Sequence, residues 1–440
     1  MFEESTSVFF RPVLAFSILI AVVFFLRKGN FTILAFPFLL YNINLGGQPI
    51  LFLNFSWIYT IICYASILYL GEKKSNYNFK TKYNIYTFFL FIIILKIVAE
   101  SFLYGLFPFR LPALIASQFY ILMPMLILIL SLRLKSFEMV IYEFCISGFV
   151  LSFLTTFILA IPIFSEQFIL AITSGHRITF FGIDTINSAR PFYYLVLFAL
   201  SLIILKKNQN FNSILLNNLL INASIIIGVL FLLLTGTRQF LIGLIFVLIL
   251  FNYGKILKSK LSSKVYSLSI LLSFGILFLV NLSLFENLEI YQRLTNEGVK
   301  VETEEGRGDI WISGWNQMIS NNWAFGLGFK NFGEEVAYED ILAGTKSSSI
   351  SGAHGFFQEV FIEHGLLLGA FYIISLFYII FIYNWRNNSP NNDNFLVLRI
   401  LCFGLIIPTF FSGDILNSFG YYFLYFITSF MHQNSRIAFN

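Results

Sequence analysis

The sequence predicts an all-α protein, a polytopic membrane helix bundle with about 12–13 transmembrane helices. Of its 440 residues, 58% are hydrophobic and only 12% are charged, whereas a soluble domain carries about 25% charged residues to keep its surface wet. The apolar residues gather in runs of about 20, the length of a helix that crosses a bilayer. Because no long polar region interrupts these runs, we expect residues 1–440 to form a single integral membrane domain.

The apolar runs follow one another along the chain, and each is a candidate spanning helix. The first is expected to be a helix of the bundle rather than a signal peptide, because Glu3 and Glu4 stand where a basic start is usual and no small-residue cleavage site follows. The runs lie at residues 8–26, 31–46, 49–70, 85–107, 111–132, 137–164, 191–205, 215–235, 239–253, 265–285, 354–384, 395–412 and 415–431.

Lysine and arginine in the short loops predict the orientation, because these residues are enriched on the cytoplasmic side of a membrane. When the chain alternates across the membrane, the basic loops all fall on one side, which we expect to be the cytoplasm. The other side receives two longer loops, residues 165–190 and 286–353, which we expect to be extracytoplasmic. The basic loops contain Lys73, Lys74, Lys80, Lys82, Arg133, Lys135, Lys206, Lys207, Lys255, Lys258, Lys260, Lys264 and Arg386.

Composition argues against several other classes of protein. The cysteines Cys63, Cys145 and Cys402 lie far apart inside apolar runs, so neither a disulfide framework nor a metal site is expected. The net charge of +5 is small and topology explains where the basic residues lie, so no nucleic-acid partner is expected. No Walker, G-x-S-x-G or zinc motif occurs, and we expect no cofactor.

The predicted extracytoplasmic side holds few lysines but several arginines. A guanidinium binds phosphate with two parallel hydrogen bonds and stays charged when partly buried, so these arginines suit an anionic lipid headgroup. Arg238 is the strongest candidate, because it lies between two apolar runs with no acidic residue nearby, where an unpaired charge is costly. The alternative is pairing with loop carboxylates, as Glu289 and Glu297 offer to Arg293. The set is Arg177, Arg190, Arg238, Arg293 and Arg307.

Residues 306–318 are expected to form a short amphipathic helix at the membrane interface, because apolar residues recur there at helical spacing. Asp309 is placed to cap its start, and Trp311 and Trp315 would lie at headgroup level. Arg307 would lie at the N-terminal end of the helix, where backbone N–H groups also favour an anion. The alternative is a helix that only packs over the bundle. The recurring residues are Ile310, Trp311, Gly314, Trp315 and Met318.

Further polar residues and glycines flank the last long runs. His354 opens the longest run, with Gln358 one helical turn further on. A histidine there can accept a proton near neutral pH, although a single histidine is more often a hydrogen-bonded structural residue. The glycines in residues 322–328 permit tight turns and close backbone approach. Within the spans, Lys96 and Glu100 form an i,i+4 pair that either stabilises its helix or marks an ion pathway.

These segments, in this order, resemble the O-antigen polymerase and ligase superfamily. The similarity extends over residues 175–370, although the family usually has His-Asn where this chain has His354-Gly355. The similar segments are H-R-I-T-F-F-G (176–182), G-T-R-Q (236–239), R-x-x-x-W-x-x-G-W (307–315), N-W-A-F-G-L-G-F (322–329) and A-H-G-F-F-Q-E-V-F-I-E-H-G-L-L-L-G (353–369).

The resemblance implies a metal-independent glycosyltransferase of the bacterial inner membrane, with its active site facing the periplasm. A hydroxyl of the acceptor sugar would attack the anomeric carbon of an undecaprenyl-diphosphate-linked glycan, and undecaprenyl diphosphate would leave. Arg238 and Arg307 would hold the diphosphate and neutralise its developing charge, and His354 would act as the base. The residues assigned to binding of diphosphate or sugar are Arg177, Arg190, Trp311, Trp315 and Gln358.

The acceptor separates two forms of this function. A polymerase uses a second lipid-linked repeat unit as the acceptor, and a chain-length regulator is a candidate partner. We favour the polymerase because the divergent, Phe-rich sequence looks like that of a gene in a variable polysaccharide locus. A ligase transfers the glycan to lipid A-core. A transporter or flippase for a lipid-linked sugar is the alternative from another class, and it would need charged residues at mid-membrane that this chain mostly lacks.

Overall fold

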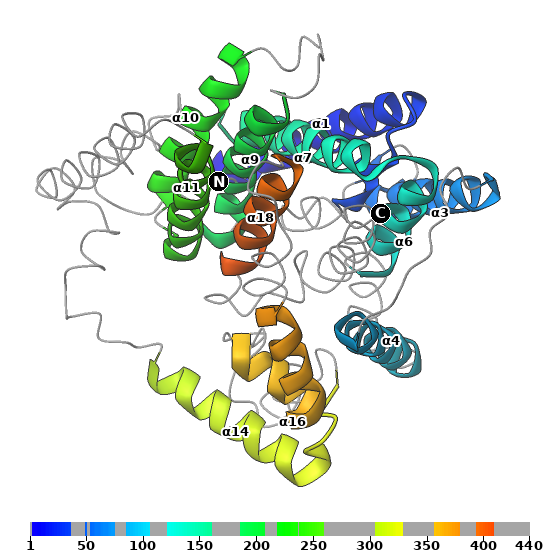
Figure 1. The fold of residues 1–440 in the computed structure, drawn as a ribbon, viewed down its shortest axis with the longest axis vertical. Coiled ribbons are helices and arrows are strands. Elements are labelled where there is room, and N and C mark those ends of the chain that lie inside the picture. Colours follow the sequence, from blue (N-terminus) through cyan, green and yellow to red (C-terminus); the bar gives the residue numbers. More distant parts are fainter. Residues whose placement is uncertain are drawn as a thin grey trace, which may run out of the picture. The chain divides into compact units, whose positions relative to one another are not determined.

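The fold is known from a computed structural model, which describes eleven stretches of the chain (Figure 1). Almost all of these residues are helical, which confirms the all-α fold class. The stretches are residues 2–36, 49–50, 53–74, 85–105, 121–160, 185–206, 218–235, 237–258, 304–328, 356–378 and 393–408. The helices are α1 (Phe2–Arg27), η1 (Phe31–Ala35), α3 (Phe55–Glu72), α4 (Ile85–Gly105), α6 (Met123–Leu134), α7 (Phe137–Ala160), α9 (Thr185–Lys206), α10 (Asn218–Thr235), α11 (Arg238–Lys258), α14 (Glu304–Asn322), α16 (Phe356–Phe377) and α18 (Asp393–Ile406).

A short β-hairpin is the one departure from helix among the elements of the described part. Strand β1 (Pro49–Ile50) pairs antiparallel with β2 (Leu53–Asn54), and Pro49 lies opposite Asn54. The apolar run at residues 49–70 therefore begins as a hairpin, and its helix α3 begins only at Phe55. Proline lacks an N–H group and suits the first position of a strand better than a helix interior.

Apolar surface on the helices fits a multi-pass membrane protein. Two described segments, Phe137–Ala160 in α7 and Phe357–Phe377 in α16, are long and apolar enough to cross a bilayer, and shorter apolar helices accompany them. Side chains at helical spacing on α3 are exposed, among them Trp57, Ile61 and Leu68. A continuous apolar stripe of this kind favours lipid over water. The number of spans stays a prediction.

The chain divides into two compact units. The first comprises residues 1–65, 138–300 and 388–404, and the second comprises residues 66–137, 301–387 and 405–440. Of the predicted outer loops, residues 165–184 lie outside the described part, and residues 185–190 already belong to α9. Residues 304–328 of the larger loop form α14 and the turn that follows it.

In the first unit, α9 is the central helix, and its side chains from residue 189 to 200 are all buried. Glycines in the neighbouring helices make room for it. A Cβ on Gly228 of α10 would lie 2.9 Å from the carbonyl oxygen of Phe192, and one on Gly148 of α7 would lie 2.5 Å from the ring of Phe198. Small residues that let helices approach closely are the usual means of packing helices in lipid, where no hydrophobic force drives them together.

A buried polar cluster ties the start of η1 to α7 in the same unit. Asn30 Oδ1 accepts hydrogen bonds from the Thr32 N–H (3.1 Å) and the Thr32 hydroxyl (2.7 Å). Asn30 Nδ2 donates to the Ser147 hydroxyl (3.1 Å), which also lies 3.1 Å from the Thr32 hydroxyl. Asn30 thereby caps η1 and satisfies polar groups that burial would otherwise leave costly.

In the second unit, α16 packs against α4 and against α14 (Figure 1). Helix α14 ends at Asn322, and the turn that follows crosses α16 halfway along its length. This crossing carries the contacts on which the site depends.

Candidate functional site

The predicted helix in the large outer loop is present as α14, but it begins earlier than expected. It starts at Glu304, so Asp309 lies inside the helix and does not cap its start. The sequence explains the extension, because acidic residues such as Glu304 and Glu305 are favourable in the first turn of a helix. Arg307 is the fourth residue of α14, within this first turn.

Helix α14 is amphipathic, with one stripe buried and an adjacent apolar stripe exposed. Met318 is fully buried in the unit, whereas Ile312 and Ile319 are exposed. Trp315 lies between the two stripes with 37% of its surface exposed. Its ring packs edge-on against Phe361 of α16, with the ring centroids 6.2 Å apart and an interplanar angle of 77°. Trp315 therefore joins α14 to α16, and Trp311 lies one turn earlier on α14.

Helix α16 begins at Phe356, just after His354, which lies outside the described residues. Gln358 lies in its first turn and is half-buried. Glu359, Glu363 and His364 follow on the same helix and are all buried. The start of α16 thus presents one half-exposed amide above a buried polar segment.

The backbone of α16 is broken at Gly365, which has φ 74° and ψ 176°. In an unbroken helix, the N–H groups of Leu366 and Leu367 would donate to the carbonyls of Ile362 and Glu363. Here each of these four groups bonds to the turn after α14 instead, and we call this arrangement the backbone clamp. Its hydrogen bonds are Leu366 N–H to Trp323 O (2.8 Å), Leu367 N–H to Ala324 O (3.3 Å), Leu327 N–H to Ile362 O (2.8 Å) and Gly328 N–H to Glu363 O (3.0 Å).

Two glycines permit the clamp to close. Gly326 has φ 76° and approaches α16 so closely that a Cβ on it would overlap the backbone at Glu363 and Gly365. A Cβ on Gly365 would overlap the backbone of Ala324 and would lie 2.5 Å from Gly326 N. The turn itself is held by Asn322, whose Oδ1 accepts from the Phe325 N–H (3.3 Å) and whose carbonyl accepts from the Gly326 N–H (2.8 Å).

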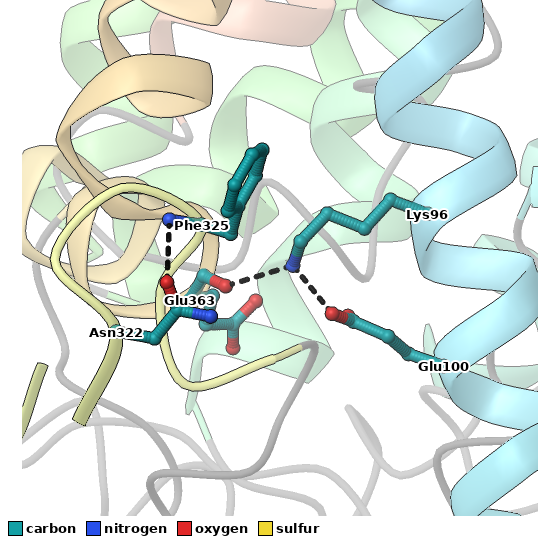
Figure 2. A network of polar contacts seen from close by, with 5 residues as sticks. All are labelled: Lys96, Glu100, Asn322, Phe325 and Glu363. Carbon is teal, nitrogen blue, oxygen red and sulfur yellow. Dashed lines mark hydrogen bonds and ion pairs between the residues drawn. The ribbon is translucent and has the colours of Figure 1, made fainter.

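Lys96 of α4 also reaches the clamp (Figure 2). Its Nζ donates to the Glu363 carbonyl at 3.2 Å and lies 2.6 Å from Oε1 of Glu100. The predicted i,i+4 pair of Lys96 and Glu100 is therefore present, and Lys96 in addition links α4 to the opened backbone of α16. Its charge inside an apolar run singles out Lys96 in the sequence, but no sequence pattern indicates its partner on α16.

In the first unit, the turn between α10 and α11 places Arg238 as the first residue of α11. Thr237 occupies the N-cap position, because its carbonyl accepts from the Leu241 N–H at 3.3 Å. Its hydroxyl lies 3.1 Å from that of Thr235, the last residue of α10. Arg238 thus lies where unpaired backbone N–H groups make the environment favourable to anions.

Gln239, next to Arg238, is a polar residue that sequence analysis did not single out. Its side chain is buried, and Nε2 has no hydrogen-bond partner among the described residues. A buried amide without a partner costs about 1–3 kcal/mol. Its position beside Arg238 makes it a candidate contact for a ligand.

The structure groups the predicted site residues as follows. Arg307, Trp311, Trp315 and Gln358 lie on two packed helices of the second unit. Arg190 and Arg238 belong to the first unit, and Arg190 is a buried residue of α9 with partners inside the chain. Arg177, like His354, lies outside the described residues.

Comparison with known proteins identifies the segment that carries α11, α14 and most of α16. Residues 223–373 match the protein-family model described as O-antigen ligase. Over this segment the chain is similar to the O-antigen ligase family. A search of curated proteins finds no significant match.

The O-antigen ligase segment confirms the superfamily predicted from the motifs, and it includes Arg238, Arg307, Trp311, Trp315 and Gln358. The match supports a polymerase-type or ligase-type function in O-antigen assembly. The helix break at Gly365 and the backbone clamp both lie inside this segment.

Proposed function

We propose that the protein is an O-antigen polymerase, which joins undecaprenyl-diphosphate-linked repeat units at the periplasmic face of the bacterial inner membrane. The observation that supports this most directly is the position of two arginines of the O-antigen ligase segment. Arg238 begins α11 and Arg307 lies in the first turn of α14. A guanidinium at a helix N-terminus combines a fixed positive charge with the favourable end of the helix dipole, which suits a diphosphate.

In the proposed reaction, a hydroxyl of the acceptor sugar attacks the anomeric carbon of the donor glycan. A new glycosidic C–O bond forms, and the bond from the anomeric carbon to the diphosphate oxygen breaks. Arg238 and Arg307 neutralise the negative charge that grows on the leaving diphosphate, where electrostatic stabilisation is most effective. His354 accepts the proton of the attacking hydroxyl.

Other residues bind the substrate in this proposal. Trp311 and Trp315 of α14 offer aromatic rings to the sugar or lipid, and Gln358 offers an amide at the start of α16. Arg177 and Arg190 are further candidates for the diphosphate. Gln239 joins them because its amide is buried directly after Arg238.

The second candidate is a ligase that transfers the glycan to lipid A-core, and the similarity to the O-antigen ligase family favours it. The two functions share the donor and differ only in the acceptor. The same arginines and histidine therefore serve either reaction, and the product distinguishes them.

The test uses purified protein in liposomes with the lipid-linked repeat unit extracted from a host that lacks this protein. Longer glycans on undecaprenyl diphosphate support the polymerase. Transfer that occurs only when lipid A-core is added supports the ligase. Chain growth without an energy source rules out transport as the sole activity, and absence of any glycan transfer under both conditions contradicts the proposal.

A further inference from the structure

The break in α16 leaves backbone hydrogen-bonding groups that lipid cannot satisfy. Four backbone groups around Gly365 lack their helical partners. Helix α16 also contains one of the two segments, among the described residues, that are long and apolar enough to cross a bilayer. Irregular backbone within a membrane is tolerated only where protein or water satisfies it. The backbone clamp satisfies all four groups, since each of them forms a hydrogen bond with residues 323–328.

The same hydrogen bonds fix α14 on α16. The clamp residues follow α14 directly after Asn322, with one turn between helix and clamp. Side-chain packing between the two helices rests on a narrow stripe around Met318 and on the edge of Trp315, and such a stripe alone sets position loosely. Backbone hydrogen bonds have defined partners, so they set the register of α14 along α16.

Lys96 adds an interaction that the clamp alone does not provide. The Glu363 carbonyl accepts both from Gly328 N–H at 3.0 Å and from Lys96 Nζ at 3.2 Å. A charged side chain within an apolar helix is costly unless it has a specific partner. Pairing with Glu100 does not explain why a charge stands at position 96, because an apolar pair at the two positions would remove both charges. The contact of Lys96 with the Glu363 carbonyl of α16 does explain it.

We propose that Lys96 is a positioning residue: by holding the Glu363 carbonyl it keeps the backbone clamp closed, and the clamp sets where α14 presents Arg307 relative to the start of α16. The catalytic consequence rests on the proposed function. The structural consequence does not. Both are measurable on the full-length protein in liposomes.

The structural test measures the distance between spin labels on α14 and α16 by pulsed electron paramagnetic resonance. The labels are attached to cysteines at Asn316 and Ile374, both exposed, in a background without the three buried native cysteines. We expect a single distance in the parent and a broader or shifted distribution in Lys96→Met. Lys96→Arg keeps a cationic donor and should keep the parent distance.

The kinetic test compares glycan transfer by the same variants with the liposome assay. We expect Lys96→Met to lower turnover at saturating donor by roughly 10- to 100-fold with a smaller change in KM, because misplacement of a catalytic group by about 1 Å has effects of this size. Lys73→Met is the matched control. It also replaces a lysine by methionine in the second unit, where Lys73 Nζ lies 4.5 Å from the centroid of the Tyr69 ring, and it should behave as the parent.

A second variant keeps the inference testable if Lys96→Met does not fold. Gly326→Ala opens the clamp from the other side with Lys96 intact, so it should change the label distance in the same way. If Lys96 and Gly326 both act through the backbone clamp, the double variant should lose little more turnover than the worse of the two single variants.

Each outcome decides a separate point. An unchanged label distance in folded Lys96→Met overturns the positioning role of Lys96, and an unchanged distance in Gly326→Ala overturns the role of the backbone clamp. A changed distance with full turnover overturns the link to catalysis. If the parent itself transfers no glycan, the proposed function fails, while the label distance still decides whether Lys96 positions α14.

Discussion

Gly326 and Gly365 each occupy the space that a Cβ on the other would need. The two residues belong to different segments, yet a Cβ on Gly326 would overlap Gly365 N, and a Cβ on Gly365 would lie 2.5 Å from Gly326 N. Both have positive φ, 76° and 74°. The clamp therefore depends on two glycines at once, and either substitution should open it.

Gly326→Ala and Gly365→Ala should each destabilise the protein more than Gly29→Ala. Gly29 also has φ 74°, but nothing lies within 4 Å of its added Cβ. All three variants place an L side chain at positive φ, which costs about 1–3 kcal/mol, and Gly365 with ψ 176° lies in a region populated almost only by glycine. The two clamp variants should add an overpacking cost of about 1–3 kcal/mol. The unfolding midpoint in detergent measures this, and equal losses for Gly29→Ala and Gly365→Ala would contradict the clamp.

Asn30→Ala should lower the free energy of unfolding by about 1–3 kcal/mol, because it leaves buried polar groups of Thr32 and Ser147 with fewer partners. Ser17→Ala is the control, since Ser17 makes only an exposed bond within its own helix, to the Val13 carbonyl at 2.8 Å. Thermal unfolding compares the two variants. A loss no larger than that of Ser17→Ala would show that the cluster contributes little to stability.

Sequence patterns predicted the helical membrane fold because apolar runs and their length determine it directly. They also locate the outer-loop helix but predict a later start, because the apolar periodicity begins only at Ile310, whereas the helix already begins at the acidic residues Glu304 and Glu305. The glycines near residue 326 were expected to allow close backbone approach, and they do. Their partner on α16 was not predicted, because a backbone hydrogen bond between distant segments leaves no pattern in either one.

The candidate site was predicted less completely for the same reason. The motifs named Arg238 and Arg307, and the structure puts each in the first turn of a helix. Burial of Gln239 depends on which helices pack around the start of α11, and the contact of Lys96 depends on the break in α16. Neither follows from spacing along one helix.

Arg238→Ala and Arg307→Ala should each abolish glycan transfer while leaving membrane insertion normal. Removing a charge that neutralises the leaving diphosphate affects the transition state, so turnover should fall by at least about 100-fold. Lysine at either position should restore activity only in part, because an ammonium lacks the two-pronged hydrogen bonding of a guanidinium. The liposome assay measures both effects, and retained activity in one alanine variant removes that arginine from the diphosphate role.

Gln239→Leu should weaken transfer without weakening the fold. Because Nε2 of Gln239 has no hydrogen-bond partner among the described residues, an apolar side chain of similar size should leave the unfolding midpoint unchanged or raise it. If the amide contacts the donor, KM for the lipid-linked repeat should rise by about 5- to 10-fold, the worth of roughly one neutral hydrogen bond. A lowered midpoint with unchanged KM would instead assign Gln239 to the fold.

The exposed apolar stripe of α14 should lie in lipid, as the predicted interfacial helix requires. Spin labels at Ile312 and Ile319 should collide more often with oxygen, which concentrates in the bilayer, than with a water-soluble nickel chelate. Labels at Ser313 and Ser320, which are polar and exposed on the same helix, are the matched controls and should favour the chelate. An amphipathic helix at an interface buries only its apolar face, so the contrast should alternate with helical periodicity along α14. Equal collision rates at all four positions would show that α14 lies outside the interface, and Trp315 would then hold α14 to α16 through Phe361 without anchoring it to the membrane.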